Sequence, residues 1–172
     1  GRGHSGVRRE VVEALQALLD ADAMPVIPSQ GSVGASGDLA PLAHMTAALM
    51  GHGWIDLGGE RLPAAAALER MGRAPLELGP KEGLALINGT QFSTALALDA
   101  LFAAERVFGA ALQAGALSVD ALKGSVKPFD ARISALRGQP GQVRVAGELS
   151  RLLEGSAIVS SHHRCGRVQD PY

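Results

Sequence analysis

Several features are rare in this sequence of 172 residues, and each scarcity excludes a class of protein. A single cysteine, Cys165, excludes an internal disulfide framework and favours a reducing compartment, so we expect a cytoplasmic protein. The formal net charge is only −1, from 16 basic and 17 acidic residues, which leaves no positive excess to bind nucleic acid or an anionic membrane. We therefore expect a small molecule or another copy of the chain as the partner.

Uninterrupted hydrophobic segments are also missing. The longest apolar stretch, residues 92–119, contains two carboxylates and an arginine, which are too costly for a lipid-exposed span. Residues 1–11 contain neither an initiator methionine nor the charged and apolar regions of a secretory signal, and residues 168–172 end in a turn-like dipeptide. We expect residues 1–172 to be a single segment from the centre of a larger domain, truncated at both ends.

The sequence does contain a succession of helical patterns. Residues 54–63 alternate around a Gly-Gly pair and predict one small β-hairpin, while the polar residues 160–172 predict a loop. The fold class is therefore all-α, a helical-bundle core with one minor hairpin. Apolar periodicity and Pro or Gly boundaries predict helices over residues 7–20, 38–50, 63–71, 81–88, 90–114, 129–136 and 142–153.

The predicted helix 90–114 is apolar on nearly every face. A helix of this kind has to be surrounded by other helices, because its apolar surface would otherwise face water. The other short helices of the sequence do not supply enough surface to cover it. We therefore expect further chain or partner subunits around this helix.

Three glycines in "GSVGASGDLAPLAH", residues 31–44, raise the question of a phosphate site. Their spacing, G-x-x-G-x-x-G without a preceding strand, differs from the dinucleotide fingerprint. A P-loop ends in Gly-Lys-Ser/Thr, whereas this loop ends in Gly37-Asp38, whose carboxylate would repel a phosphate. A nucleophile elbow, G-x-S-x-G, would need glycine where Asp38 stands. A glycine-rich turn that caps a helix, or a reaction of the backbone itself, remains.

The small side chains of residues 34–37 let the backbone fold more tightly than a turn requires. Such compression would allow the amide nitrogen of Gly37 to attack the carbonyl carbon of Ala35 and close a five-membered ring. Loss of one water from the ring and one from Ser36 then leaves an exocyclic methylene, which is an electrophile. Standard side chains supply no strong carbon electrophile, so a protein that needs one must bind it or make it.

The segment "GSVGASGDLAPLAHM" resembles the signature of the aromatic amino-acid ammonia-lyase family. The resemblance implies that Ala35, Ser36 and Gly37 cyclise by themselves to 4-methylidene-imidazole-5-one (MIO), without an external cofactor. "RGHSGVRREV" is similar to the family's helix before the triad, "KEGLALINGTQ" to its segment with the active-site Asn, and "CGRVQDPY" to its Gln-Asp-Pro-Tyr motif. The resemblance covers the whole chain and implies the helical catalytic domain of that family.

The details of these motifs imply a substrate. "GDLAPLAHM" and "VQDPY" resemble the members that act on L-histidine, which eliminate ammonia to give trans-urocanate in the first step of histidine degradation. The alternatives are a phenylalanine or tyrosine ammonia-lyase or an aminomutase, or a non-catalytic helical interaction module. The sequence leaves open whether the electrophile reacts with the α-amine or with the imidazole. In both cases a general base removes the β-proton and positioned donors stabilise charge.

The resemblance also implies roles for single residues. Asn88 would hydrogen-bond the MIO ring or the substrate amine, Gln169 would line the substrate pocket, and Tyr172 would place a phenol near the reacting centre. Asp38 would assist ring formation. Each residue also has a plainer interpretation, Asp38 as a helix cap, Asn88 as a helix-terminating residue, and Gln169 and Tyr172 as loop residues.

Other parts of the site are implied to lie outside this chain. In the family, a tyrosine base comes from a preceding loop, and an arginine for the substrate carboxylate follows the residue that matches Tyr172. The family's sites are assembled from several subunits of a homotetramer. We therefore expect residues 1–172 alone to be inactive.

Two other groups of polar residues have simpler explanations. His162, His163 and Cys165 lie within four residues, but adjacent histidines do not easily face one ion and no second ligand pair follows. We expect a polar loop there and no metal. The charged residues 8–10 are expected on a solvated helix face or at a subunit contact.

Overall fold

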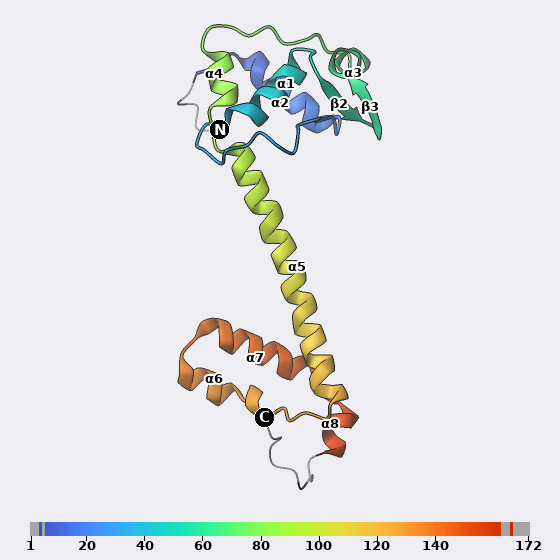
Figure 1. Ribbon diagram of the computed structural model, residues 1–172, viewed down its shortest axis with the longest axis vertical. Helices are drawn as coiled ribbons and strands as arrows, with labels where there is room; N and C mark the ends of the chain where they lie inside the picture. The colour runs from blue at the N-terminus through green and yellow to red at the C-terminus, as the bar shows by residue number, and fades with distance from the viewer. Residues whose placement is uncertain (1–3, 5, 163–165, 167–172) are drawn as a thin grey trace. The chain divides into compact units, whose positions relative to one another are not determined.

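The computed structural model describes residues 4, 6–162 and 166, and the chain forms two compact units, Gly1–Leu98 and Asp99–Tyr172 (Figure 1). The longest helix, α5 (Gln91–Ala121), begins in the first unit and ends in the second. Both units are mainly helical, and one small sheet is found among the described residues. The predicted fold class, all-α with a minor hairpin, is confirmed.

The described residues of the first unit form four helices besides the start of α5. The amphipathic pattern of α1 buries Val11 and Leu18 and leaves its charged face in water, as its spacing predicts. Pro63 lies at the N-terminal boundary of α3, and Asn88 follows the last residue of α4, so both predicted boundaries are confirmed. These helices are α1 (Arg9–Asp20), α2 (Leu39–Leu49), α3 (Ala64–Arg70) and α4 (Glu82–Ile87).

The sheet contains the predicted hairpin and one additional strand. Strands β2 (Trp54–Leu57) and β3 (Glu60–Pro63) pair antiparallel around the Gly-Gly turn, with Trp54 opposite Pro63. Strand β1 (Met24–Pro25) adds to the other edge of β2, in the order β1-β2-β3. The sequence did not predict β1, because two residues carry no alternation and a proline inside them argues against a strand.

The core of the first unit joins the sheet to three helices. Ile55 of β2 is fully buried against α3, and Leu49 at the end of α2 is almost fully buried. Burying side chains of this size contributes about 1.5–3 kcal/mol each, so this cluster holds the C-terminal part of α2 in place. The position of the glycine loop, which leads directly into α2, depends on this support. The cluster consists of Leu18, Ala23, Ala48, Leu49, Ile55, Ala64, Ala67 and Leu68.

Helix α5 is longer than predicted and remains largely uncovered. It continues to Ala121 rather than to about residue 114, and Ala116 is its only buried residue among those described. No helix in the described part of the chain is both long and apolar enough to cross a membrane. The apolar side chains of α5 are largely exposed, although a helix with apolar residues on nearly every face is expected to be covered by other helices. Those more than one third exposed include Leu96, Leu98, Leu101, Phe102, Val107, Phe108 and Leu117.

The second unit adds short helices after α5. The predicted helix at 129–136 begins two residues later, because residues 127–129 form a 3-10 turn and Asp130 caps the helix through the Arg132 amide at 2.9 Å. The predicted loop from residue 160 is wrong at its start, since Ser156 caps a helix that includes Ser160. The elements are η1 (Lys127–Phe129), α6 (Ala131–Arg137), α7 (Pro140–Leu152) and α8 (Ala157–Ser161).

Candidate functional site

The glycine loop connects β1 to α2 in the first unit. Gly34 has φ +65° and Gly37 has φ +91°, backbone conformations that side-chain-bearing residues rarely adopt. The two glycines flank Ala35 and Ser36, and the backbone bends at Ser36 and Gly37. A glycine at each position is therefore required by the backbone and not only by the space around it.

Asp38 closes the loop. Its side chain is fully buried, and its two carboxylate oxygens accept hydrogen bonds from the Ser32 hydroxyl and from the Val33 amide, the latter at 3.0 Å. Buried carboxylates are costly unless they are hydrogen-bonded, so these two donors hold the side chain in place. Asp38 stands at the N-cap position of α2, but its side chain caps no helical amide. The capping interpretation is therefore wrong, because the carboxylate turns back to the loop.

The loop lies against the end of α4. The amides of Gly37 and Asp38 donate to the carbonyl oxygen of Gly89 at 3.1 and 3.3 Å. A Cβ atom added to Gly37 would overlap Oδ1 of Asn88 and would lie 3.3 Å from its Cγ. The Asn88 side chain thus fills the space beside Gly37 that a larger residue would occupy. The structure brings the predicted triad, Asp38 and Asn88 together, although Asn88 lies 50 positions after Asp38 in the sequence.

Gln169 and Tyr172, the other two predicted site residues, lie outside the described residues, as do His163 and Cys165 of the polar tail. Among the residues that the structure describes, no group of three or more His, Cys, Asp or Glu side chains is arranged to hold a metal ion. The described side chains of the candidate site are therefore those of the glycine loop and of the end of α4.

An ion pair between α1 and α4 anchors the α4 side of the site. Glu82 is almost fully buried and accepts hydrogen bonds from the Arg8 amide at 2.9 Å, from Arg8 Nε at 3.0 Å and Nη2 at 2.8 Å, and from the Gly79 amide at 2.6 Å. Arg8 Nη2 also donates to the Glu77 carbonyl at 2.5 Å. The Arg8 side chain is 47% exposed, as expected for a solvated face, but its guanidinium also holds the start of α4, which the sequence did not predict.

This arrangement has a consequence for pH dependence. The hydrogen bonds from the Arg8 side chain, followed by those from the Arg8 and Gly79 amides, lower the pKa of Glu82 from 4.5 to about 2. The folded-state pKa lies below the unfolded value, so the stabilisation is complete above about pH 4.5 and is lost as the pH falls toward 2. Glu82→Gln in the full-length protein is expected to lower Tm at pH 7 and to flatten the fall of Tm across this window.

The matched control for that prediction is Glu60→Gln. Glu60 pairs with Arg70 at 3.0 Å, but both side chains are 61% exposed, and exposed pairs contribute little. Thermal unfolding recorded at several pH values compares the two variants with the parent protein. A Glu82 variant whose Tm follows the parent across the window would contradict the anchoring role.

Sequence reasoning missed three groups at this site: the Ser32 hydroxyl, the Gly89 carbonyl and the Arg8–Glu82 pair. Ser32 lies six residues before Asp38, a spacing that no local motif marks, and the Gly89 carbonyl is a backbone group. Arg8 and Glu82 are 74 residues apart, so no periodicity connects them. A charged residue at the start of each helix was the only available signal for the pair, and charged residues there are common.

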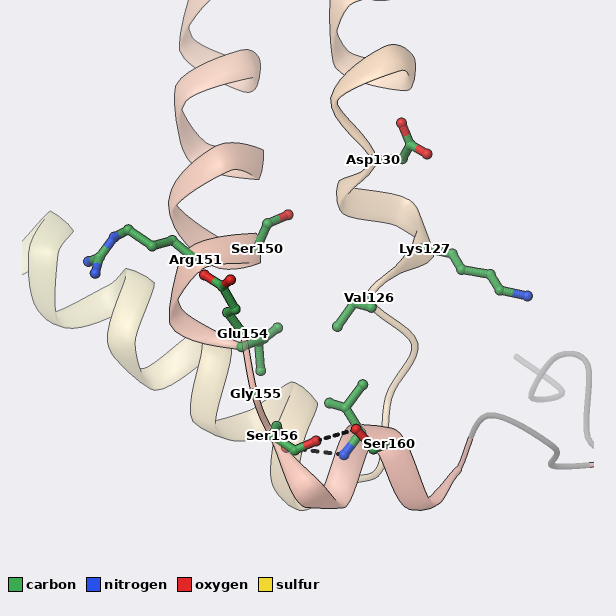
Figure 2. A pocket seen from close by; sticks show the side chains of 11 residues that line it. Val126, Lys127, Asp130, Ser150, Arg151, Glu154, Gly155, Ser156 and Ser160 are labelled. Carbon is green, nitrogen blue, oxygen red and sulfur yellow. Dashed lines mark hydrogen bonds between the residues drawn. The ribbon is translucent and has the colours of Figure 1, made fainter.

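A hollow lies in the second unit, and none of the predicted site residues lines it. Figure 2 shows Lys127 and Arg151 pointing away from each other, so these two cations do not converge on one ligand. Ser156 at its floor is engaged as the cap of α8. This space of about 670 Å³ is lined by Val126, Lys127, Asp130, Ser150, Arg151, Leu153, Glu154, Gly155, Ser156, Val159 and Ser160.

The glycine loop and the Asn88 segment both lie within a match to one protein family. A family model described as "Aromatic amino acid lyase" matches residues 1–172. The chain belongs to the aromatic amino acid lyase family. This membership covers both units, so the glycine loop and the Asn88 segment are parts of one family pattern.

Individual family members show how the chain relates to them. A histidine ammonia-lyase of Burkholderia multivorans is 64% identical over the whole chain, which spans 34% of that protein. The solved histidine ammonia-lyase of Trypanosoma cruzi is 36% identical over 87% of this chain and 29% of its own, with a TM-score of 0.78. The phenylalanine aminomutase of Pantoea agglomerans is 30% identical over 99% and 34%, with a TM-score of 0.83. The chain thus spans about a third of the curated relative's length.

Proposed function

We propose that the full-length protein of this aromatic amino acid lyase chain is a histidine ammonia-lyase that converts L-histidine to trans-urocanate and ammonia. The observation that carries the reaction class is the Ala35-Ser36-Gly37 loop held against Asn88 by the Gly89 carbonyl. The substrate is supported by 64% identity to a histidine ammonia-lyase, compared with 30% to a phenylalanine aminomutase. The phenylalanine, tyrosine and aminomutase alternatives have less support.

The described residues fit the MIO group that the family resemblance implies. Gly37 has a positive φ angle, carries no Cβ and lies beside the Asn88 amide, which supports a backbone compact enough for residues 35–37 to close on themselves. Once formed, MIO supplies the electrophilic methylene that standard side chains lack. The position of Asn88 beside Gly37 at the end of α4 supports its proposed hydrogen bond to this segment or to the substrate amine. Asp38 holds the loop closed from the other side.

The remaining tasks fall to residues that this structure does not place. Removal of the β-proton needs a general base, and the developing charge needs positioned donors. Gln169 in the substrate pocket and Tyr172 near the reacting centre remain predictions from the sequence. A tyrosine base and an arginine for the carboxylate come from beyond this chain in the family pattern.

We also propose a homotetramer for the full-length protein. The uncovered apolar side chains of α5 support burial by further helices, from the remaining two thirds of the protein or from other subunits. The family resemblance implies that such subunits complete each site. Residues 1–172 alone are therefore proposed to be inactive, and the cytoplasmic location stays a prediction from the sequence.

The test is an assay of the purified full-length protein with L-histidine, L-phenylalanine and L-tyrosine as separate substrates. Formation of urocanate is followed by its ultraviolet absorbance, and ammonia is measured independently. We expect turnover of L-histidine with at least a hundredfold preference in kcat/KM, about 3 kcal/mol. A preference for either other amino acid would refute the substrate proposal, and ammonia-free isomerisation would indicate an aminomutase.

A further inference from the structure

Ser32 lies at the upstream end of the glycine loop and makes two hydrogen bonds across it. Its hydroxyl donates to Oδ2 of Asp38 and accepts a hydrogen bond from the Gly34 amide at 3.2 Å. The neighbouring Val33 amide donates to Oδ1 of the same carboxylate at 3.0 Å. Residues 32 and 38 are therefore joined side by side, and residues 33–37 form an arch between them.

The downstream end of this arch is fixed independently. Asp38 is fully buried, and its amide, like that of Gly37, is held by the Gly89 carbonyl. Because a buried carboxylate cannot exchange its protein donors for water, it needs both of the donors it has. Ser32 supplies one of them. Without its hydroxyl, Oδ2 of Asp38 would be left unpaired and the upstream end of the arch would be held by the Val33 amide alone.

We propose that Ser32 is a positioning residue for MIO formation, because its hydroxyl closes residues 32–38 into an arch that brings Gly37 toward Ala35. This inference rests on the proposed function. In the ring-forming step, the Gly37 nitrogen forms a bond to the Ala35 carbonyl carbon and loses its proton. The carbonyl oxygen leaves as water with this proton and the Ser36 amide proton, and a C=N double bond forms between the Ala35 carbonyl carbon and the Ser36 nitrogen. Ser36 loses its Cα hydrogen and its hydroxyl as a second water, so two waters account for all atoms lost.

Ser32 takes no part in these bond changes and acts on the geometry of the chain. Holding two reacting groups of one chain close together removes conformational freedom that ring closure would otherwise have to remove. Gly34 and Gly37 have positive φ angles, and the backbone is already bent at Ser36 and Gly37, within the reacting segment. Loss of the Ser32 hydroxyl should therefore slow ring formation without changing the chemistry of a ring that has formed.

The experiment measures ring formation directly in the full-length protein. Newly synthesised protein is quenched at successive times and digested with trypsin, and the peptide of residues 10–61 is weighed, since no Lys or Arg lies between Arg9 and Arg61. The variants are Ser32→Ala, Ser32→Cys and Ser32→Thr. Ser29→Ala is the matched control, because Ser29 is an exposed serine of the same loop and no hydrogen bond of its side chain is seen among the described residues.

We expect the parent, Ser32→Thr and Ser29→Ala to lose two waters at similar rates. Ser32→Ala should do so at least about tenfold more slowly, with Ser32→Cys in between because a thiol is a weaker donor. The value of kcat per cyclised subunit should stay within about twofold of the parent, which a merely destabilised site would not preserve. Tm values confirm that the variants compared are folded.

Each other outcome overturns a specific statement. A folded Ser32→Ala protein that cyclises at the parental rate overturns the role of Ser32 and leaves the proposed function intact. If Ser32→Ala does not fold, a Ser32→Cys rate equal to that of the parent has the same meaning. An unchanged cyclisation rate with a lower kcat per cyclised subunit assigns Ser32 to the substrate instead. A parent protein that loses no water overturns the proposed function, and this inference with it.

Discussion

Ser36→Ala is expected to lower kcat for L-histidine by at least about a thousandfold in the full-length protein, since no other side chain can supply the electrophile. Alanine has no hydroxyl to lose as water, so the exocyclic methylene cannot form. Ser36 is exposed in the glycine loop and makes no side-chain hydrogen bond among the described residues, so its replacement should leave the fold intact. The effect therefore falls on the chemistry and not on stability.

Two measurements on the same sample check this expectation. Urocanate formation gives kcat, and the mass of the peptide of residues 10–61 shows whether two waters were lost. Ser150→Ala serves as the control, because Ser150 makes only an exposed hydrogen bond, 3.2 Å to the Phe129 carbonyl, in the second unit. If Ser36→Ala keeps more than about a tenth of the parental kcat, the self-made electrophile is wrong.

Gly37→Ala is expected to prevent ring formation and to abolish activity by two physical effects. The φ angle of +91° is strained for alanine, at a cost of about 1–3 kcal/mol. In addition, the new Cβ would overlap Oδ1 of Asn88, so either the loop or the end of α4 must move. A displaced Gly37 amide would leave the Gly89 carbonyl. We expect no loss of two waters and no measurable turnover of L-histidine.

Two further variants separate these effects. Gly34→Ala introduces a positive-φ alanine at +65° with no atom within 4 Å of its Cβ, so it reports the backbone cost alone. Combining Gly37→Ala with Asn88→Ala removes the overlap and should recover part of the lost Tm, although not the activity, because Asn88 belongs to the proposed site. If Gly37→Ala lowers Tm no more than Gly34→Ala does, the contact with Asn88 is not tight.

The local elements of the fold could be predicted because their signals lie within a few residues of one another. The amphipathic period of α1, Pro63 before α3 and the Gly-Gly turn between β2 and β3 each depend on neighbouring side chains and backbone preferences. The predictions are wrong where contacts with residues distant in the sequence determine the local structure. Strand β1 forms because it pairs with the free edge of β2. The Asp38 carboxylate accepts hydrogen bonds from Ser32 and Val33 and does not cap α2.

The residues of the candidate site also fall into two groups, those that sequence motifs identify and those that only the structure shows. The Ala35-Ser36-Gly37 triad, Asp38 and Asn88 can be found as short motifs, because the proposed ring formation demands particular residue types in a fixed order. The partners that hold these residues cannot be found by motif. The Gly89 carbonyl is a backbone group, and the Arg8–Glu82 pair joins segments 74 residues apart.

The sequence by itself therefore determined the helical class, the family resemblance and the three residues that we propose form the MIO electrophile. Only the tertiary structure decided that Asn88 and Gly89 meet Gly37, that Arg8 anchors α4, and that Ser32 closes the loop on Asp38. The physical reason is the range of the interactions. Helix and strand propensity and residue spacing depend on a few neighbouring residues. Burial and long-range hydrogen bonds depend on which distant segments lie together in the folded chain.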